Sequence, residues 1–148
     1  MKRFMLLKFL LGLLGLIFVV GLGLDAFWLE PSSIRLARHD VTVDAPFLKD
    51  MTIAVISDLH AGAPYIDNAK IDRIVAMTNE AHPDIILLTG DYVIRGMPFG
   101  HHMPAEKIVA HLKQLRAPMG VYSVLGNHDH WENGPRIASL FRAAGIPD

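Results

Sequence analysis

Three short apolar runs, each followed at once by a polar motif, constrain the fold of this chain more than any other feature. The polar motifs are SDLH at 57–60, GDY at 90–92 and GNHD at 126–129. Short unbroken apolar runs bounded by turn residues are typical of buried strands, and amphipathic helical patterns separate these three runs. Strands joined by helices lie parallel, so we expect the three motifs to meet at the carboxyl ends of one sheet.

The helices are predicted from their apolar stripes and their end signals. The first spans Asp67 to Ala81 and begins at a capping residue. The second opens at Pro104, because proline suits the first turn of a helix. The third has Asn133 as its cap and Gly145 as its terminator. The βαβαβα order predicts an α/β fold, with a three-stranded parallel sheet covered by helices on both faces.

An apolar segment precedes this domain. Residues 9–24 carry no charge, and the apolar stretch reaches back to Phe4 if the stem of Lys8 lies in lipid while its ammonium group points outward. A segment of this length can span a bilayer. A secretory signal peptide is the competing interpretation, but the apolar core is long and lacks a good cleavage site, which favours a transmembrane anchor over residues 1–24.

The charges around the segment predict its orientation. Lys2, Arg3 and Lys8 lie on its amino side, which predicts a single-pass, N-in anchor in the cytoplasmic membrane with the domain on the outer side. All 15 acidic residues lie after position 24, together with 11 of the 14 Lys and Arg residues, so the rest of the chain is net negative. It carries no basic stripe typical of proteins that bind nucleic acid, and we expect no such partner.

A connector is expected between the anchor and the domain. It covers residues 25–50, and the domain proper covers residues 51–148. Within the connector, Val41-Thr42-Val43 alternates apolar and polar side chains, which predicts an edge strand.

The polar motifs supply ligands that divalent cations prefer. The chain has no cysteine, so oxygen and imidazole must hold any metal, a donor set that suits manganese, iron or zinc. Asp58 and His60 are two residues apart and, at an extended strand end, project to the same side. The Asp91 carboxylate can bridge two cations, and Asn127 can give a carbonyl oxygen to the second. His128 points elsewhere and is free to act as a general acid.

In these motifs the chain resembles the calcineurin-like metallophosphoesterases, whose pattern is D-x-H, then G-D, then G-N-H-[DE]. The anchor and connector look similar to the membrane-anchored branch, which includes phosphohydrolases related to the UDP-diacylglucosamine hydrolases of lipid A synthesis. The resemblance implies two divalent metal ions. Asp58 and His60 would hold one ion, Asp91 would bridge both, and Asn127 would hold the second. His128 would protonate the leaving group.

Two departures from the family pattern affect the expected site. The family continues with a metal-binding histidine and a G-H-x-H motif, neither of which occurs before Asp148. We therefore expect a metallophosphoesterase-type α/β sandwich that is truncated at its C-terminus, with an incomplete second metal site. Ile94 replaces an aspartate that orients the catalytic histidine in the phosphatase branch. Arg95, the next residue, does match a phosphate-contacting arginine of that branch.

The expected function is metal-dependent hydrolysis of a phosphodiester or pyrophosphate bond, by water that the metal ions activate. The anchor makes the lipid bilayer a partner and favours a phosphorylated, lipid-linked substrate such as UDP-diacylglucosamine. The alternative is a truncated, non-catalytic membrane-anchored protein that holds a metal weakly, because the ligands named above underfill both coordination spheres.

Overall fold

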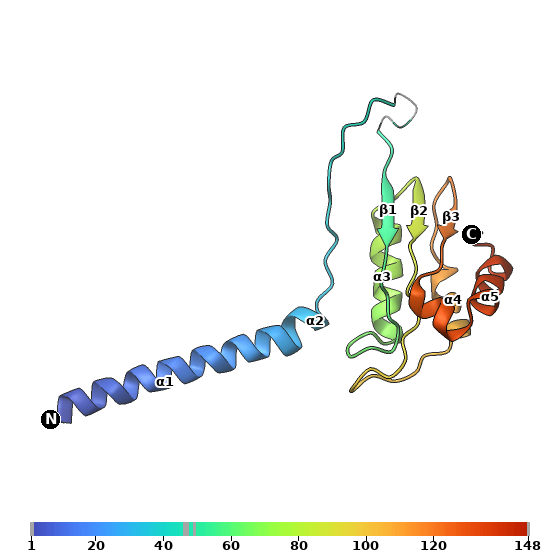
Figure 1. The fold of residues 1–148 in the computed structure, drawn as a ribbon. Helices are drawn as coiled ribbons and strands as arrows, with labels where there is room; N and C mark the ends of the chain where they lie inside the picture. The colour runs from blue at the N-terminus through green and yellow to red at the C-terminus, as the bar shows by residue number, and fades with distance from the viewer. Residues whose placement is uncertain (1, 46–47, 49, 148) are drawn as a thin grey trace. The chain divides into compact units, whose positions relative to one another are not determined.

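The computed structural model describes residues 2–45, 48 and 50–147, which form two units that divide after Arg35. The first unit is helical (Figure 1): α1 (Lys2–Leu24) continues through a π-helical turn, η1 (Asp25–Leu29), into α2 (Glu30–Ser32). Within the described residues, the span Arg3–Ser32 is long and apolar enough to cross a membrane, a test that a signal sequence also passes. The helix thus extends past residue 24, where the anchor was predicted to end.

The connector differs from its prediction. Residues 33–43 contain no helix or strand, and the edge strand expected at Val41-Thr42-Val43 is not formed. Both valines are exposed. An alternating pattern forms a strand only where it gains a hydrogen-bonded neighbour and an apolar surface to cover, and these residues gain neither. Connector residues 46, 47 and 49 lie outside the described residues.

The second unit contains the predicted parallel sheet. Its strands are β1 (Ile53–Ile56), β2 (Ile85–Leu88) and β3 (Val121–Ser123), in the order β1-β2-β3. Their apolar, largely β-branched sequences suit a pleated surface. The strand arrows in Figure 1 point the same way, so the segments that follow the three strands emerge at one end of the sheet.

Three helices connect and follow the strands. α3 (Asn68–Glu80) matches its prediction, and the Asp67 side chain caps it by accepting the Lys70 N–H at 2.8 Å. α4 (Ala105–Leu112) has Pro104 as its N-cap rather than in its first turn. α5 (Asn127–Ala143) begins earlier than predicted and is kinked at Asn133. The Asn133 side chain accepts the Arg136 N–H at 3.2 Å, so it caps the second segment of α5, as the sequence indicated.

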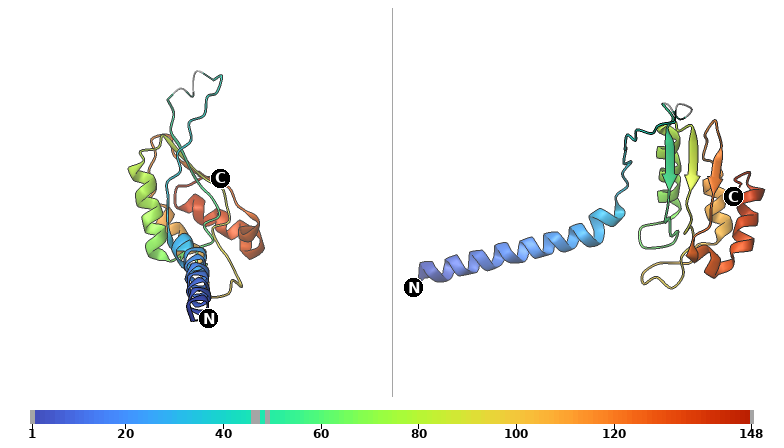
Figure 2. Two further views of the ribbon diagram at one scale, coloured as in Figure 1. Left: turned by 90° about the vertical axis from the view of Figure 1, so that its left-hand side faces the viewer. Right: turned by 45° about the horizontal axis from the view of Figure 1, so that its top comes forward.

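The helices leave one face of the sheet uncovered, which corrects the prediction that both faces are buried. Ile86 and Leu88 point into the core, whereas Val55 and its neighbours Leu87 and Tyr122 share the opposite face. Val55 is 60% exposed and Tyr122 is 42% exposed. α3 and α4 lie behind the sheet in Figure 1, and the left view of Figure 2 shows α3 to one side of it. Successive right-handed crossovers that advance in one direction place their helices on the same face, and the order β1-β2-β3 never reverses.

Candidate metal centre

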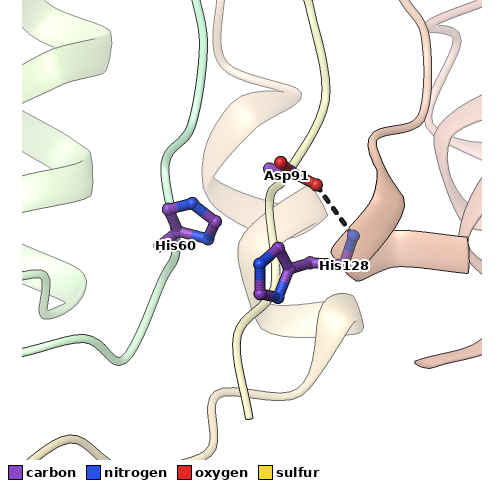
Figure 3. A group of neighbouring side chains, drawn as sticks. All are labelled: His60, Asp91 and His128. Carbon is purple, nitrogen blue, oxygen red and sulfur yellow. Dashed lines mark hydrogen bonds between the residues drawn. The ribbon is translucent and has the colours of Figure 1, made fainter. Parts of the chain in front are cut away.

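The segments that follow the three strands bring His60, Asp91 and His128 together (Figure 3). One ligand atom from each residue lies within 4.8 Å of the others, and all three side chains are half-buried. His60 follows β1, Asp91 follows β2, and His128 lies in the first turn of α5. The His60 and His128 rings meet edge to face, with centroids 4.8 Å apart. The expected convergence at the carboxyl ends of the strands therefore occurs, and it includes His128.

Asp58 and Asn127 lie beside this cluster. Asp58 Oδ1 is 3.8 Å from His60 Nε2, and the Asp58 side chain is mostly exposed. The Asn127 amide faces Asp91 Oδ2: in one orientation its nitrogen donates to that oxygen at 3.3 Å, and in the other the two oxygens face each other. In the first orientation the amide oxygen also accepts the His128 N–H at 3.3 Å, so Asn127 joins the loop after β2 to the start of α5.

The backbone at three predicted ligands is in the left-handed region. Asp58, His60 and Asp91 have φ values of 51°, 43° and 55°. This conformation is unfavourable for residues other than glycine, by roughly 1–2 kcal/mol each, and such outliers cluster at functional sites. The segment from Asp58 to His60 is thus not the extended strand end that was expected. Its side chains come together because of the turn, not because of strand alternation.

The residues present fit a divalent cation. Within the described part of the chain, His60 Nδ1 is the single buried side-chain nitrogen or oxygen that has no hydrogen-bond partner. A buried polar atom without a partner is costly, and a metal ion would supply the missing interaction. Imidazole nitrogen with carboxylate and amide oxygen is a donor set for manganese, iron or zinc.

Asp129 holds the loops that carry the cluster. It is completely buried, and its carboxylate accepts backbone N–H groups from both loops. The donors are Asp91 N (2.8 Å) and Gly126 N (2.9 Å) to Oδ2, and Tyr92 N (3.0 Å) and Val93 N (3.2 Å) to Oδ1. In return, Asp91 Oδ1 accepts the His128 N–H at 2.9 Å. The motifs in the sequence predict no role for Asp129, although it lies at N3 of α5, where a carboxylate commonly bonds back to the N-cap.

Glycine lets these two loops approach each other. A Cβ added to Gly126 would lie 2.1 Å from Asp91 Oδ1, and one added to Gly90 would lie 2.4 Å from Gly126 N. Gly90 also has a φ of 101°. Both distances are far below van der Waals contact, so any side chain at either position would push the loops apart.

Arg95 lies outside the cluster and pairs with Glu132, a residue for which the sequence motifs predict no role. Its Nε donates to Glu132 Oε2 at 2.9 Å, and His102 Nδ1 is 4.0 Å from the same oxygen. The Glu132 side chain is only 4% exposed, whereas that of Arg95 is 67% exposed. A pocket of about 370 Å³ lies between the loops that follow β1 and β2, and Arg95, His101 and His102 help to line it. A larger pocket of about 760 Å³, along α3 and α4, contains none of the predicted site residues.

The known proteins to which this chain is similar include metallophosphoesterases, in agreement with the candidate metal centre. The chain is 28% identical over 122 residues to the uncharacterized metallophosphoesterase YkuE of Bacillus subtilis, which covers 81% of this chain and 41% of that protein. It is 33% identical over 104 residues to the UDP-2,3-diacylglucosamine pyrophosphatase LpxG of Chlamydia muridarum, covering 69% of this chain and 30% of LpxG. A bovine transmembrane protein with a metallophosphoesterase domain is 31% identical over 102 residues, covering 69% of this chain and 22% of that protein.

The chain spans less than half the length of these curated relatives. No solved structure gives a significant match. The family model for calcineurin-like phosphoesterases matches residues 51–146, which include every motif described above. The resemblance noted in the sequence is thereby confirmed, and the chain belongs to the calcineurin-like phosphoesterase family.

Proposed function

We propose that the chain carries the ligands of a metal-dependent phosphoesterase that hydrolyses a phosphodiester or pyrophosphate bond. The observation that carries this proposal is the convergence of His60, Asp91 and His128 within 4.8 Å, with a buried imidazole nitrogen left without a partner. Two divalent cations, when bound, would lower the pKa of water and neutralise charge on the phosphoryl oxygens.

Each residue has a proposed role that follows from its position. Asp58 and His60 would hold one cation, because the turn after β1 brings their side chains together. Asp91 would bridge both cations with its two oxygens, and Asn127, which faces it, would hold the second. His128 would donate a proton to the leaving oxygen.

Arg95 would contact a phosphate of the substrate. Glu132 fixes its Nε, while the Arg95 side chain as a whole is 67% exposed. A guanidinium held at one nitrogen still offers its other N–H groups in a planar arrangement that suits phosphate. We therefore propose that Glu132 orients Arg95 toward the substrate phosphate and does not prevent the remaining N–H groups of Arg95 from binding it.

The proposed substrate is a phosphorylated lipid such as UDP-diacylglucosamine. LpxG is named for that compound, and this chain carries an apolar helix long enough to cross a membrane. The proposed location is the cytoplasmic membrane, with an N-in anchor. An N-in anchor would place the domain on the outer side, where a phosphorylated lipid without a nucleotide is the expected substrate, and UDP-diacylglucosamine would be the substrate only if the domain faces the cytoplasm. Reporter fusions after residue 147 therefore test the substrate: an outer location would exclude UDP-diacylglucosamine.

A second candidate function is metal binding without hydrolysis. It is favoured because the clustered group, within the described residues, holds three ligands, which suits one cation better than two. Asp58 is mostly exposed and lies at the edge of the group.

The test compares metal binding and hydrolysis in the full chain, purified in detergent. Asp91→Asn is the test variant, and Asp72→Asn on α3 is the matched control, because Asp72 is exposed and lies outside the cluster. We expect Mn²⁺ binding by calorimetry and hydrolysis of bis(p-nitrophenyl) phosphate to be lost in Asp91→Asn alone. Binding without hydrolysis in the unaltered chain would favour the second candidate. Equal Mn²⁺ binding by all three proteins would refute the proposed centre.

A further inference from the structure

Four large apolar side chains lie exposed on the segments that surround the candidate metal centre. We call Tyr65, Met97, Phe99 and Trp131 the apolar rim. Phe99 is 100% exposed and Trp131 is 73% exposed. Large apolar side chains scattered singly need no explanation, but these four come from three segments that meet at one end of the domain.

The position of the rim follows from the fold. Tyr65 lies in the loop after β1, Met97 and Phe99 lie in the loop after β2, and Trp131 lies in the first segment of α5. Both loops emerge at the end of the sheet to which the strand arrows point (Figure 1). The Trp131 ring is 4.8 Å from the His128 ring, measured between centroids, so the rim reaches the metal centre directly.

The two loops are held together, so the rim is a defined surface. The His101 N–H donates to the Gly62 carbonyl at 2.7 Å. A Cβ added to Gly62 would lie 2.0 Å from the His101 carbonyl oxygen, and Gly62 has a φ of 95°. The loop that carries Phe99 is therefore packed, backbone against backbone, on the loop that carries His60.

Phe99 is the most unusual member of the rim. Its φ is 61°, in the left-handed region that bulky residues rarely adopt. A strained backbone that presents a fully exposed aromatic ring gains nothing from packing within the described residues. Such a conformation is expected where the side chain acts on something outside the protein.

Cationic and imidazole groups lie in the same loop as Met97 and Phe99. Arg95, His101 and His102 line the pocket of about 370 Å³ in the same loop. Within the described residues, Arg95 pairs with the carboxylate of Glu132, whose side chain is 4% exposed, so the positive partner is the one that faces outward. Exposed aromatic side chains near cationic groups match the boundary of a bilayer, where rings enter the headgroup region and cations contact lipid phosphates.

We propose that the apolar rim docks the domain onto an anionic lipid surface, with Phe99 and Met97 entering the headgroup region beside the metal centre. Lipid is favoured over a protein partner because the rim consists of side chains from three separate segments rather than one continuous apolar face, and because the same chain carries an apolar helix of membrane-spanning length. A tethered domain meets its own membrane at high effective concentration, so a small apolar contact is sufficient. The proposal does not depend on hydrolysis.

The absence of cysteine from the chain permits a direct test. In the full chain, Pro98→Cys places a fluorescent label between Met97 and Phe99 and leaves both in place. Met119→Cys is the matched control, because Met119 is also exposed but lies before β3, at the opposite end of the sheet. Each labelled protein is reconstituted in vesicles of phosphatidylcholine with phosphatidylglycerol, with or without a lipid that carries a nitroxide quencher on its headgroup.

We expect quenching at position 98 to exceed quenching at position 119 at least threefold, and Phe99→Ser in the Pro98→Cys background to remove most of the difference. A smaller difference in vesicles of phosphatidylcholine alone would support the contribution of the cationic groups. Equal quenching at the two positions would overturn the proposal, as would a difference that Phe99→Ser leaves unchanged. Mn²⁺ binding, measured on the same samples, reports on the metal centre separately, so failure of one proposal is distinguishable from failure of the other.

Discussion

The buried carboxylate of Asp129 holds the loop that follows β2 against the start of α5, and replacing it tests this contact directly. It accepts four backbone N–H groups at 2.8 to 3.2 Å and has no exposed surface. Two of these donors lie at Asp91 and Gly126, so the same carboxylate fixes the proposed bridging ligand and the start of α5. Asp129→Asn keeps the size of the side chain and removes one acceptor oxygen and the charge.

The expected cost follows from the hydrogen bonds that are lost. An asparagine oxygen can still accept two of the four N–H groups, but its NH₂ group then faces the other two donors. Hydrogen bonds to a charged acceptor contribute about 1.5–3 kcal/mol each, and leaving buried donors unpaired costs a comparable amount. We therefore expect Asp129→Asn to lower the free energy of unfolding by about 3–5 kcal/mol, a large fraction of the ~5–15 kcal/mol that is typical of a domain.

The assay is urea denaturation of the full chain in detergent, followed by far-UV circular dichroism, with Mn²⁺ affinity measured in parallel. Asp67→Asn is the control. Asp67 is exposed and accepts one N–H, from Lys70, and asparagine caps a helix about as well as aspartate, so its cost should be below ~0.5 kcal/mol. A cost for Asp129→Asn within about 1 kcal/mol of the control would refute the reasoning.

Three further outcomes are expected. Burial, and then the nearby Asp129 charge, raise the pKa of the Tyr92 phenol. The unfolded chain therefore ionises first, so stability should be insensitive to this group below about pH 10 and fall by up to ~1.4 kcal/mol per pH unit above it, a slope that Tyr92→Phe should remove in urea titrations. Gly126→Ala should weaken Mn²⁺ binding roughly tenfold or more in calorimetry, because its Cβ would meet Asp91 Oδ1 at 2.1 Å; unchanged affinity would contradict this. Val55→Thr with Val124→Thr should reduce light scattering by the protein at equal concentration, because both valines are more than half exposed, Val55 on the uncovered sheet face and Val124 directly after β3.

Local patterns in the sequence determined much of this fold. The strands and α3 lie where their apolar runs and stripe predicted, because period and capping are properties of neighbouring residues. The convergence of His60, Asp91 and His128 also followed, since the carboxyl ends of parallel strands meet at one end of the sheet. The strand predicted from the alternation at Val41-Thr42-Val43 is not formed, because a strand also needs a neighbouring strand, which a local pattern does not indicate.

Tertiary structure decided the remaining features. One sheet face is uncovered because each new strand lies on the same side of the previous one, in the order β1-β2-β3. A strand order that reverses would have the same helical crossovers in its sequence, so the sequence does not distinguish the two arrangements. The role of Asp129 depends on backbone N–H groups that lie 36 to 38 residues away along the chain, and the pairing of Arg95 with Glu132 spans 37 residues. The sequence by itself therefore determined which side chains could form the site. Long-range packing decided how these side chains are held, because hydrogen bonds between residues far apart along the chain leave no periodic signal in the sequence.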